Sequence, residues 1–412
     1  MANVKPFKAI RPKKDLEQRI AALPYDVYNR EEARREVEKE PFSFLKIDRA
    51  ETQFPDDVDI YADCVYEKAH DLLWEMVDNG EFIEETGDCY YIYELIMEGR
   101  SQVGITACAS VDDYLNQVIR KHENTRADKE LDRIRHVDTC KAQTGPIFLA
   151  YRSHPAINEE VEKTRKTKPL YDFTAADGIS HKVWKIEEEE AIKKIRTAFM
   201  EVKNIYIADG HHRCASAVKV SLKRREDNPD YTGEEEFNYF LSVLFPDDQL
   251  MIMDYNRVVK DLNGLETEEF LKCIEKDFYL EKMGTKPYRP EKKGYFGMYL
   301  EDCWYRLEVR EPVCSDNPVE ALDVAVLQNK LLAPILGIDE PKTDKRIDFV
   351  GGIRGLEELE RRVHSDAKVA FALYPTSITE LFAVSDAKML MPPKSTWFEP
   401  KLRSGLFIHK IS

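Results

Sequence analysis

The sequence predicts a mixed α/β (α+β) protein, because strand-like and helix-like segments alternate along the whole chain. Two β-rich runs, Tyr90–Met97 and Ser101–Ser110, flank a short polar turn and predict a hairpin. Apolar residues recur at the helical period in Ala62–Asn79. A short strand at Asn204–Ile207 runs through Asp-Gly into a helix expected from His211 to about Glu226.

The elements before residue 200 follow from apolar spacing, turn residues and charge. Pro24 ends a predicted helix at Lys14–Ala22, because the residue before proline avoids the α region. Charge pairs four residues apart support a helix at Glu31–Glu38. We further expect strands at Val4–Pro12, Pro41–Ile47 and Pro146–Tyr151 and paired strands in Tyr171–Ile186, with helices at Ala127–Ala142, Ile157–Thr164 and Glu187–Met200.

The later part of the chain is expected to form a second region. A chain of 412 residues exceeds what one hydrophobic core supports, and a polar stretch near Asp261–Thr267 suggests a boundary. We therefore predict regions 1–262 and 263–412. The expected elements are strands at Phe237–Phe245, Met251–Arg257, Gly294–Val309 and Val369–Tyr374, and helices at Glu268–Phe278, Ala321–Ala333 and Ile378–Met389.

Charge and cysteine usage exclude several classes of protein. The formal net charge of −16 disfavours a general nucleic-acid binder. The eight cysteines are dispersed without C-x-x-C spacing, and no apolar run has the length of a membrane span or a signal sequence. We expect a cytoplasmic protein with reduced thiols and without a nucleic-acid or membrane partner; the sequence predicts no particular oligomeric state.

The most informative stretch is Ile205–Arg213, where a strand passes through Asp209 and Gly210 into a helix. Backbone amides at a helix N-terminus are unpaired and carry partial positive charge, so phosphates bind there. His211, His212 and Arg213 lie in the first turn, which normally prefers acidic residues, and a bound anion would offset that cost. The alternative makes Asp209 an ordinary N-cap, the two histidines neutral surface groups and Arg213 a salt-bridge partner. A zinc site is disfavoured, because adjacent histidines on a helix diverge.

Ala208–Arg213 resembles the signature of the ParB/sulfiredoxin superfamily, in particular the Asp-Gly-His-His-Arg run of free-serine kinases. The whole chain resembles domain-of-unknown-function family 1015 at several runs. These are Pro6–Pro12, Pro24–Val27, Phe44–Ile47 with Arg49 and Glu51, His122–Thr125, Pro146–Leu149, His181 with Trp184, Leu322–Val324 and Met391–Thr396. The resemblance implies a ParB/sulfiredoxin-like mixed-sheet core elaborated by N-terminal and C-terminal segments. It does not extend to sulfiredoxin chemistry, since Cys214 comes too late in the motif and is expected in the core.

The resemblance to serine kinases also implies roles for individual residues. Asp209 would assist catalysis near Mg²⁺, and Gly210–Arg213 would hold the donor phosphates of ATP, ADP or pyrophosphate. Those enzymes use an N-terminal carboxylate as general base on the serine hydroxyl. Asp26 is the first candidate for that role and Glu51 the second; the alternative for Asp26 is a turn residue that caps local amides.

Further candidates for donor or acceptor contacts each have a structural alternative. His122, Glu123 and Thr125 precede a helix and could contact a ligand or cap that helix. Arg133 could serve a phosphate or pair with neighbouring carboxylates. His181 could lie near a site or be a satisfied core histidine, and Lys394 could belong to a substrate loop or a rigid turn.

The function predicted from these residues is Mg²⁺-dependent phosphoryl transfer from a nucleotide or pyrophosphate to a small hydroxyl compound, with free L-serine as the leading acceptor. The chain has neither a Walker A motif nor a kinase glycine-rich loop. The alternative is a ParB-like protein that binds and hydrolyses a nucleotide to regulate partners, without kinase activity toward a metabolite. It would act without the DNA-binding helix-turn-helix of ParB, for which the sequence offers no convincing candidate.

Overall fold

The computed structural model describes residues 1–311, 313 and 315–412, and the chain forms two compact units. Unit 1 comprises residues 1–250 and 400–412, and unit 2 comprises residues 251–399. This division differs from the predicted one in two places. Residues 251–262 join unit 2, because the strand Tyr255–Val259 lies inside its sheet. Residues 400–412 return to unit 1, because the strand Ile408–Lys410 pairs with strands from the first half of the chain.

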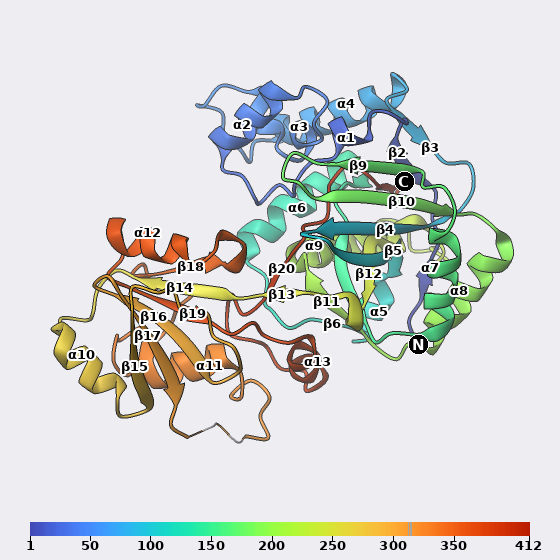
Figure 1. Ribbon diagram of the computed structural model, residues 1–412. Coiled ribbons are helices and arrows are strands. Elements are labelled where there is room, and N and C mark those ends of the chain that lie inside the picture. Colours follow the sequence, from blue (N-terminus) through green and yellow to red (C-terminus); the bar gives the residue numbers. More distant parts are fainter. Residues whose placement is uncertain (312, 314) are drawn as a thin grey trace. The chain divides into compact units, whose positions relative to one another are not determined.

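The predicted mixed α/β class is confirmed, and unit 1 is built on a large mixed sheet (Figure 1). The strand order is β6-β11-β8-β12-β5-β4-β10-β9, with β1 paired to β5. The β11–β6 and β12–β8 pairs are parallel, and the other pairs are antiparallel. The strands are β1 Val4–Lys5, β4 Tyr90–Met97, β5 Arg100–Ser110, β6 Ile119–Arg120, β8 Ile147–Tyr151, β9 Tyr171–Thr174, β10 Ser180–Ile186, β11 Ile205–Asp209 and β12 Tyr239–Pro246.

A smaller antiparallel sheet of unit 1 joins segments distant in sequence, in the order β3-β2-β21-β7. Its strands are β2 Ala9–Pro12, β3 Phe82–Glu84, β7 Ala142–Gln143 and β21 Ile408–Lys410. The α-helices of unit 1 are α1 Glu17–Ile20, α2 Arg30–Lys39, α3 Leu45–Asp48, α4 Asp63–Asp78, α5 Val111–Leu115, α6 Ala127–Cys140, α7 Pro155–Arg165, α8 Glu189–Glu201 and α9 His211–Asp227, with short 3₁₀ turns at η1 Ala50–Gln53, η2 Glu236–Asn238 and η3 Asp247–Gln249.

Unit 2 contains, within its described residues, an antiparallel sheet in the order β15-β17-β16-β19-β14-β18 and a two-stranded ribbon, β13-β20. One face of the sheet buries Val258 and Ala370 against Leu359 of α12. The strands are β13 Ile252–Met253, β14 Tyr255–Val259, β15 Phe278–Gly284, β16 Tyr295–Leu300, β17 Cys303–Val309, β18 Ile347–Gly351, β19 Val369–Leu373 and β20 Trp397–Phe398. The helices are α10 Thr267–Ile274, α11 Asp323–Leu327, the π-helical η4 Gln328–Leu332, the 3₁₀ turn η5 Gly352–Arg354, α12 Glu357–Ser365 and α13 Ile378–Asp386.

The prediction of a strand at Pro41–Ile47 is wrong. The segment forms turns and enters α3, and the amide of Ile47 donates to the carbonyl of Phe44 instead of to a neighbouring strand. Phe44, Leu45 and Ile47 are all buried in one core cluster with residues of α4. A short apolar run fits a buried helical turn as well as a strand, so its spacing alone does not distinguish the two.

Within the described residues, no helix has the length and apolarity required to cross a membrane.

Candidate phosphate site at the N-terminus of helix α9

The turn between β11 and α9 has the geometry of an anion-binding helix start. Gly210 is the N-cap residue with φ +91°, in the left-handed region that glycine adopts without strain. A Cβ at this position would lie 3.2 Å from Nε of Arg213, so glycine also permits the close approach of that side chain. Helix α9 has no side-chain cap, which leaves its first amides available to a ligand.

Asp209 does not act as the ordinary N-cap of the alternative interpretation. Its Oδ1 accepts from the amide of Gly210 at 2.7 Å, and its Oδ2 accepts from Nζ of Lys401 at 2.9 Å. Burial alone would raise the pKa of Asp209, but Lys401 and Arg213 outweigh burial and hold the pKa below its usual range. Asp209 is therefore an ionised carboxylate. No sequence signal pointed to Lys401, because it lies 192 residues from Asp209.

His122 and His211 form a neutral pair next to this turn. Their rings meet edge to face with centroids 4.6 Å apart. Burial lowers the pKa of His122 to about 4, against the opposing effects of the Ile207 carbonyl and Asp209. Burial, followed by the neighbouring His122, lowers the pKa of His211 well below its usual value. Two imidazoles without charge can approach an anion as hydrogen-bond donors or acceptors, according to tautomer.

Two ring nitrogens of the first helical turn are buried without a hydrogen-bond partner among the described residues. They are Nε2 of His211 and Nδ1 of His212. Arg213 donates from Nη1 to the carbonyl of Pro146 at 2.6 Å, and within the described chain it forms no ion pair with a carboxylate. Buried polar groups are normally satisfied, so unused hydrogen-bonding capacity on consecutive residues makes this turn a candidate ligand site.

The predicted loop Pro24–Val27 lies next to these residues. Asp26 is exposed. Burial lowers the pKa of His212, and the negative charge of Asp26 acts in the opposite direction and raises it. The Tyr25 ring lies under the guanidinium of Arg133, 4.1 Å from the ring centroid. Burial raises the pKa of Tyr25 to about 12, although Arg133 and Arg213 act in the opposite direction. Of the two candidate bases, Asp26 is thus the carboxylate whose charge reaches the helix start.

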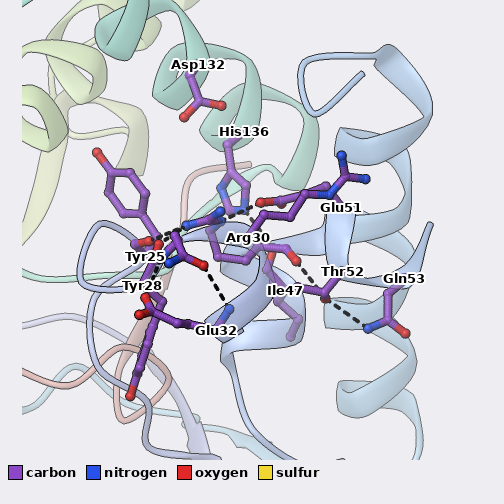
Figure 2. Close-up of polar contacts among 12 residues, drawn as sticks. Tyr25, Tyr28, Arg30, Glu32, Ile47, Glu51, Thr52, Gln53, Asp132 and His136 are labelled. Carbon is purple, nitrogen blue, oxygen red and sulfur yellow. Dashed lines mark hydrogen bonds and ion pairs between the residues drawn. The ribbon is translucent and has the colours of Figure 1, made fainter. Parts of the chain in front are cut away.

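Glu51 lies near the loop of Tyr25 and Tyr28 (Figure 2) and holds that loop in position through Arg49. Nε of Arg49 donates to Glu51 at 2.5 Å, and its Nη1 donates to the carbonyls of Tyr25 and Tyr28 at 2.9 and 2.5 Å. Glu51 is buried at 5% exposure. Its carboxylate therefore orients the cation that fixes the backbone on either side of Asp26, which is a positioning role.

A small cavity behind the loop has a mainly apolar lining that also includes Asp48, Arg133, His136 and Arg213. Its volume of about 30 Å³ is enough for a water molecule but too small for a nucleotide. Arg133 is bound through Nε and Nη2 to the carboxylate of Asp132 at 3.0 and 2.9 Å. This pairing is the structural alternative that the sequence left open for Arg133.

The remaining candidates divide between the two units. Thr125 donates to the Glu130 carboxylate at 2.7 Å, ahead of α6, while Glu123 is half-buried in the preceding loop. His181 is fully buried in the sheet between β4 and β9 and is bonded to Tyr93. Lys394 belongs to unit 2. Predicted residues that lie near one another are Asp209–Arg213, His122, Asp26 and Arg133.

Comparison with known proteins gives a family. The family model described as Protein of unknown function (DUF1015) matches residues 4–325. No curated protein matches the chain.

Solved structures similar to this chain include SbnI with C-terminal truncation from Staphylococcus aureus, with 11% identity, 71% of this chain and 82% of that chain covered, and a TM-score of 0.38. They also include a free serine kinase in complex with AMP, with 15% identity, coverage of 74% and 91%, and a TM-score of 0.35. A conserved hypothetical protein from Pyrococcus furiosus has 13% identity, coverage of 76% and 96%, and a TM-score of 0.36.

Proposed function

This chain belongs to the DUF1015 family, and we propose a function for it from the geometry of its own site. The proposed function is phosphoryl transfer from a nucleotide or pyrophosphate to a small hydroxyl compound. The observation that carries the proposal is the unused hydrogen-bonding capacity of the first turn of α9, where buried nitrogens of His211 and His212 have no partner among the described residues. The uncapped helix start adds unpaired amides in the same place.

The donor phosphates would lie at the turn Gly210–Arg213, against the amides of His211–Arg213, with the guanidinium of Arg213 as the neighbouring cation. Among the described residues, no group of three or more His, Cys, Asp or Glu side chains could hold a metal. Mg²⁺ needs no such group, because it is commonly bound by one or two carboxylates together with substrate phosphates and water. The ionised carboxylate of Asp209 fits that arrangement, and the ion would neutralise charge on the phosphates.

The acceptor hydroxyl would be activated by Asp26. The hydroxyl proton passes to the Asp26 carboxylate, the hydroxyl oxygen forms a bond to the transferred phosphorus, and the bond from phosphorus to the donor's bridging oxygen breaks. Lys401, held at 2.9 Å from Asp209, adds positive charge beside the phosphates. Free L-serine is the first acceptor to test, because the Asp209–Arg213 run resembles that of free-serine kinases.

The test is to incubate the full chain with Mg²⁺, L-serine and, in turn, ATP, ADP and pyrophosphate, and to measure O-phosphoserine by mass spectrometry. We expect product with one donor, and a loss of about 10²- to 10³-fold in the Asp209→Asn variant, because a preorganised charge at the reacting phosphate is removed. Asp172→Asn, a change at an exposed carboxylate of β9, is the matched control and should keep full activity.

Absence of product with every donor would contradict the kinase function with L-serine. If one nucleotide is nonetheless hydrolysed, and the hydrolysis is lost in Asp209→Asn, the result would favour the regulatory nucleotide-binding protein over the kinase.

A further inference from the structure

Unit 2 contains a buried arginine whose charge is not balanced. Arg257 lies on β14, between Asn256 and Val258, and is 3% exposed. Val258 points into the cluster beneath α12, so Arg257 points to the opposite face of the sheet, because successive side chains on a strand alternate. Such core-facing positions are normally apolar, and charged residues are rarely buried there without a partner.

The hydrogen bonds of Arg257 do not neutralise it. Its Nη1 donates to the carbonyl of Tyr255, and its Nη2 donates to the carbonyl of Pro393 at 3.5 Å. Along the described chain, no carboxylate lies within 4.0 Å of the guanidinium, although the other buried arginines of the molecule, such as Arg133, have such a partner. Burial lowers the pKa of Arg257 to about 10, so the group remains charged at neutral pH.

This guanidinium faces a cavity of about 100 Å³. The other walls are mainly apolar and rigid: Val324, Gln328, Leu332, Pro392 and Pro393. Gln328 donates from Nε2 to the carbonyl of Ile338 at 2.7 Å, which fixes its amide. Gln328 and Leu332 are the first and last residues of the π-helical turn η4, a distortion that occurs frequently at functional sites.

The loop that closes the cavity is held in an unusual conformation. Lys394 has φ +59°, in the left-handed region that residues with a side chain rarely adopt. Ser395 donates to the carbonyl of Pro392 at 2.6 Å, and its own carbonyl accepts from Thr376 at 3.0 Å. The Nζ of Lys394 lies 5.7 Å from the centroid of the Tyr255 ring, which brings a second cation to the strand that carries Arg257.

We infer that unit 2 binds, at Arg257, the oxyanion of a small organic carboxylate or phosphate whose apolar part fills the proline-walled cavity. The planar guanidinium presents donors in a geometry that matches both oxyanions. A bound oxyanion supplies the balancing charge that the described residues lack. This site shares no residue with the proposed phosphate site, since all its residues belong to residues 251–399.

The test uses the full chain carrying Arg213→Gln, which weakens anion binding at α9. Acetate, propionate and inorganic phosphate are titrated calorimetrically against a chloride background of equal ionic strength. We expect saturable binding of at least one probe, and a dissociation constant about 10- to 100-fold larger when Arg257→Met is added, because a charged hydrogen bond is lost. Arg354→Gln, at an exposed arginine of the same unit, is the matched control and should leave binding unchanged.

Lys394→Gln provides a second variant at an exposed position and should weaken binding severalfold while the fold is kept. Binding of acetate and propionate alone identifies a carboxylate ligand, and binding of phosphate alone identifies a phosphate ligand. The inference is overturned if no probe binds in the Arg213→Gln background, or if binding is equal with and without Arg257→Met. Those outcomes would leave Arg257 as a clamp on the two carbonyls, and they are independent of the kinase assay.

Discussion

The cluster around His181 and the cluster around His211 and His122, both in unit 1, differ in how much hydrogen-bonding capacity they use. His181 uses both ring nitrogens: Nε of Arg403 donates to its Nε2 at 3.2 Å, so its Nδ1–H donates to the Tyr93 hydroxyl oxygen at 2.8 Å. His211 packs against the ring of His122, and its Nε2 has no partner among the described residues. Both histidines are neutral, because burial lowers the pKa of each.

The comparison shows what separates a structural histidine from a candidate ligand-binding one. Burial and neutrality are common to both clusters, so neither property identifies a site. The difference lies in the hydrogen bonds: both ring nitrogens of His181 have partners, whereas Nε2 of His211 has none among the described residues. We therefore propose a ligand-binding role for the start of α9 and a structural role for His181, two alternatives that the sequence alone left undecided for His181.

The largest effect on catalysis is expected at Asp26, the proposed general base beside the cluster of His211 and His122. Asp26→Asn should lower kcat by about 10²- to 10⁴-fold, because the amide cannot accept the hydroxyl proton. Its free energy of unfolding should change by less than about 0.5 kcal/mol, since Asp26 is exposed. Steady-state kinetics and urea unfolding measure both. A full loss in Glu51→Gln with normal turnover in Asp26→Asn would exchange the two assignments.

Substitution of His181, whose two ring nitrogens are both hydrogen-bonded, should instead lower the stability of the protein. His181→Phe leaves the Tyr93 hydroxyl and the Arg403 guanidinium without their buried partner, and we expect a loss of about 3 kcal/mol in the free energy of unfolding. Turnover per folded molecule should stay at the wild-type value. Urea unfolding measures the free energy of unfolding, and active-site-normalised kinetics measure the turnover. A stable but inactive variant would show that His181 contributes to function.

Acidic pH should destabilise the protein through His122, which packs against His211. Because the pKa of His122 falls to about 4 on folding, the unfolded chain binds more protons between its ordinary value and pH 4, and stability falls as pH decreases through that window. From pH 7 to pH 5 this residue should account for about 2 kcal/mol. The wild type should lose that much more stability than His122→Phe over the same range. Equal pH dependence in the two proteins would show that His122 is not buried neutral.

The smallest effect concerns a single hydrogen bond to the donor. His211→Ala should raise the dissociation constant of the bound nucleotide about tenfold, since one contact to a charged phosphate is removed. The free protein should lose less stability than His181→Phe does, because no existing hydrogen bond of Nε2 is broken. Calorimetric titration measures the affinity, and an unchanged dissociation constant would separate His211 from the phosphates.

The elements that the sequence predicted well are those with local signals. The helix expected from His211 to about Glu226 is α9, His211–Asp227, because an Asp-Gly turn and apolar spacing mark it. The segment Pro41–Ile47 was mistaken for a strand, because its fate depends on packing against α4 and not on its own pattern. The periodicity of a long segment is enough to predict its secondary structure. The structure of a short apolar run depends on the elements that it packs against.

The sequence singled out the turn at which we propose the phosphate site, but not the residues that surround that turn. Asp209–Arg213 could be chosen because cations in a first helical turn conflict with the helix dipole. The contacts of Lys401 with Asp209, and of Arg49 with the carbonyls beside Asp26, carry no sequence signal, since they join segments brought together only by the folded sheet. The return of residues 400–412 to unit 1 carries no sequence signal for the same reason, because the strand pairing of residues 408–410 is a long-range contact.

The return of residues 400–412 to unit 1 has a consequence for biosynthesis. A ribosome releases the segments of unit 1 that precede residue 251 long before it releases Lys401 and β21, with all of unit 2 synthesised in between. During that interval Asp209 lacks its cation, and β2 and β7 lack the strand that joins them. The nascent chain therefore acquires its proposed phosphate site only after residues 400–412 have been synthesised, so products that stop before Lys401 should lack the proposed activity.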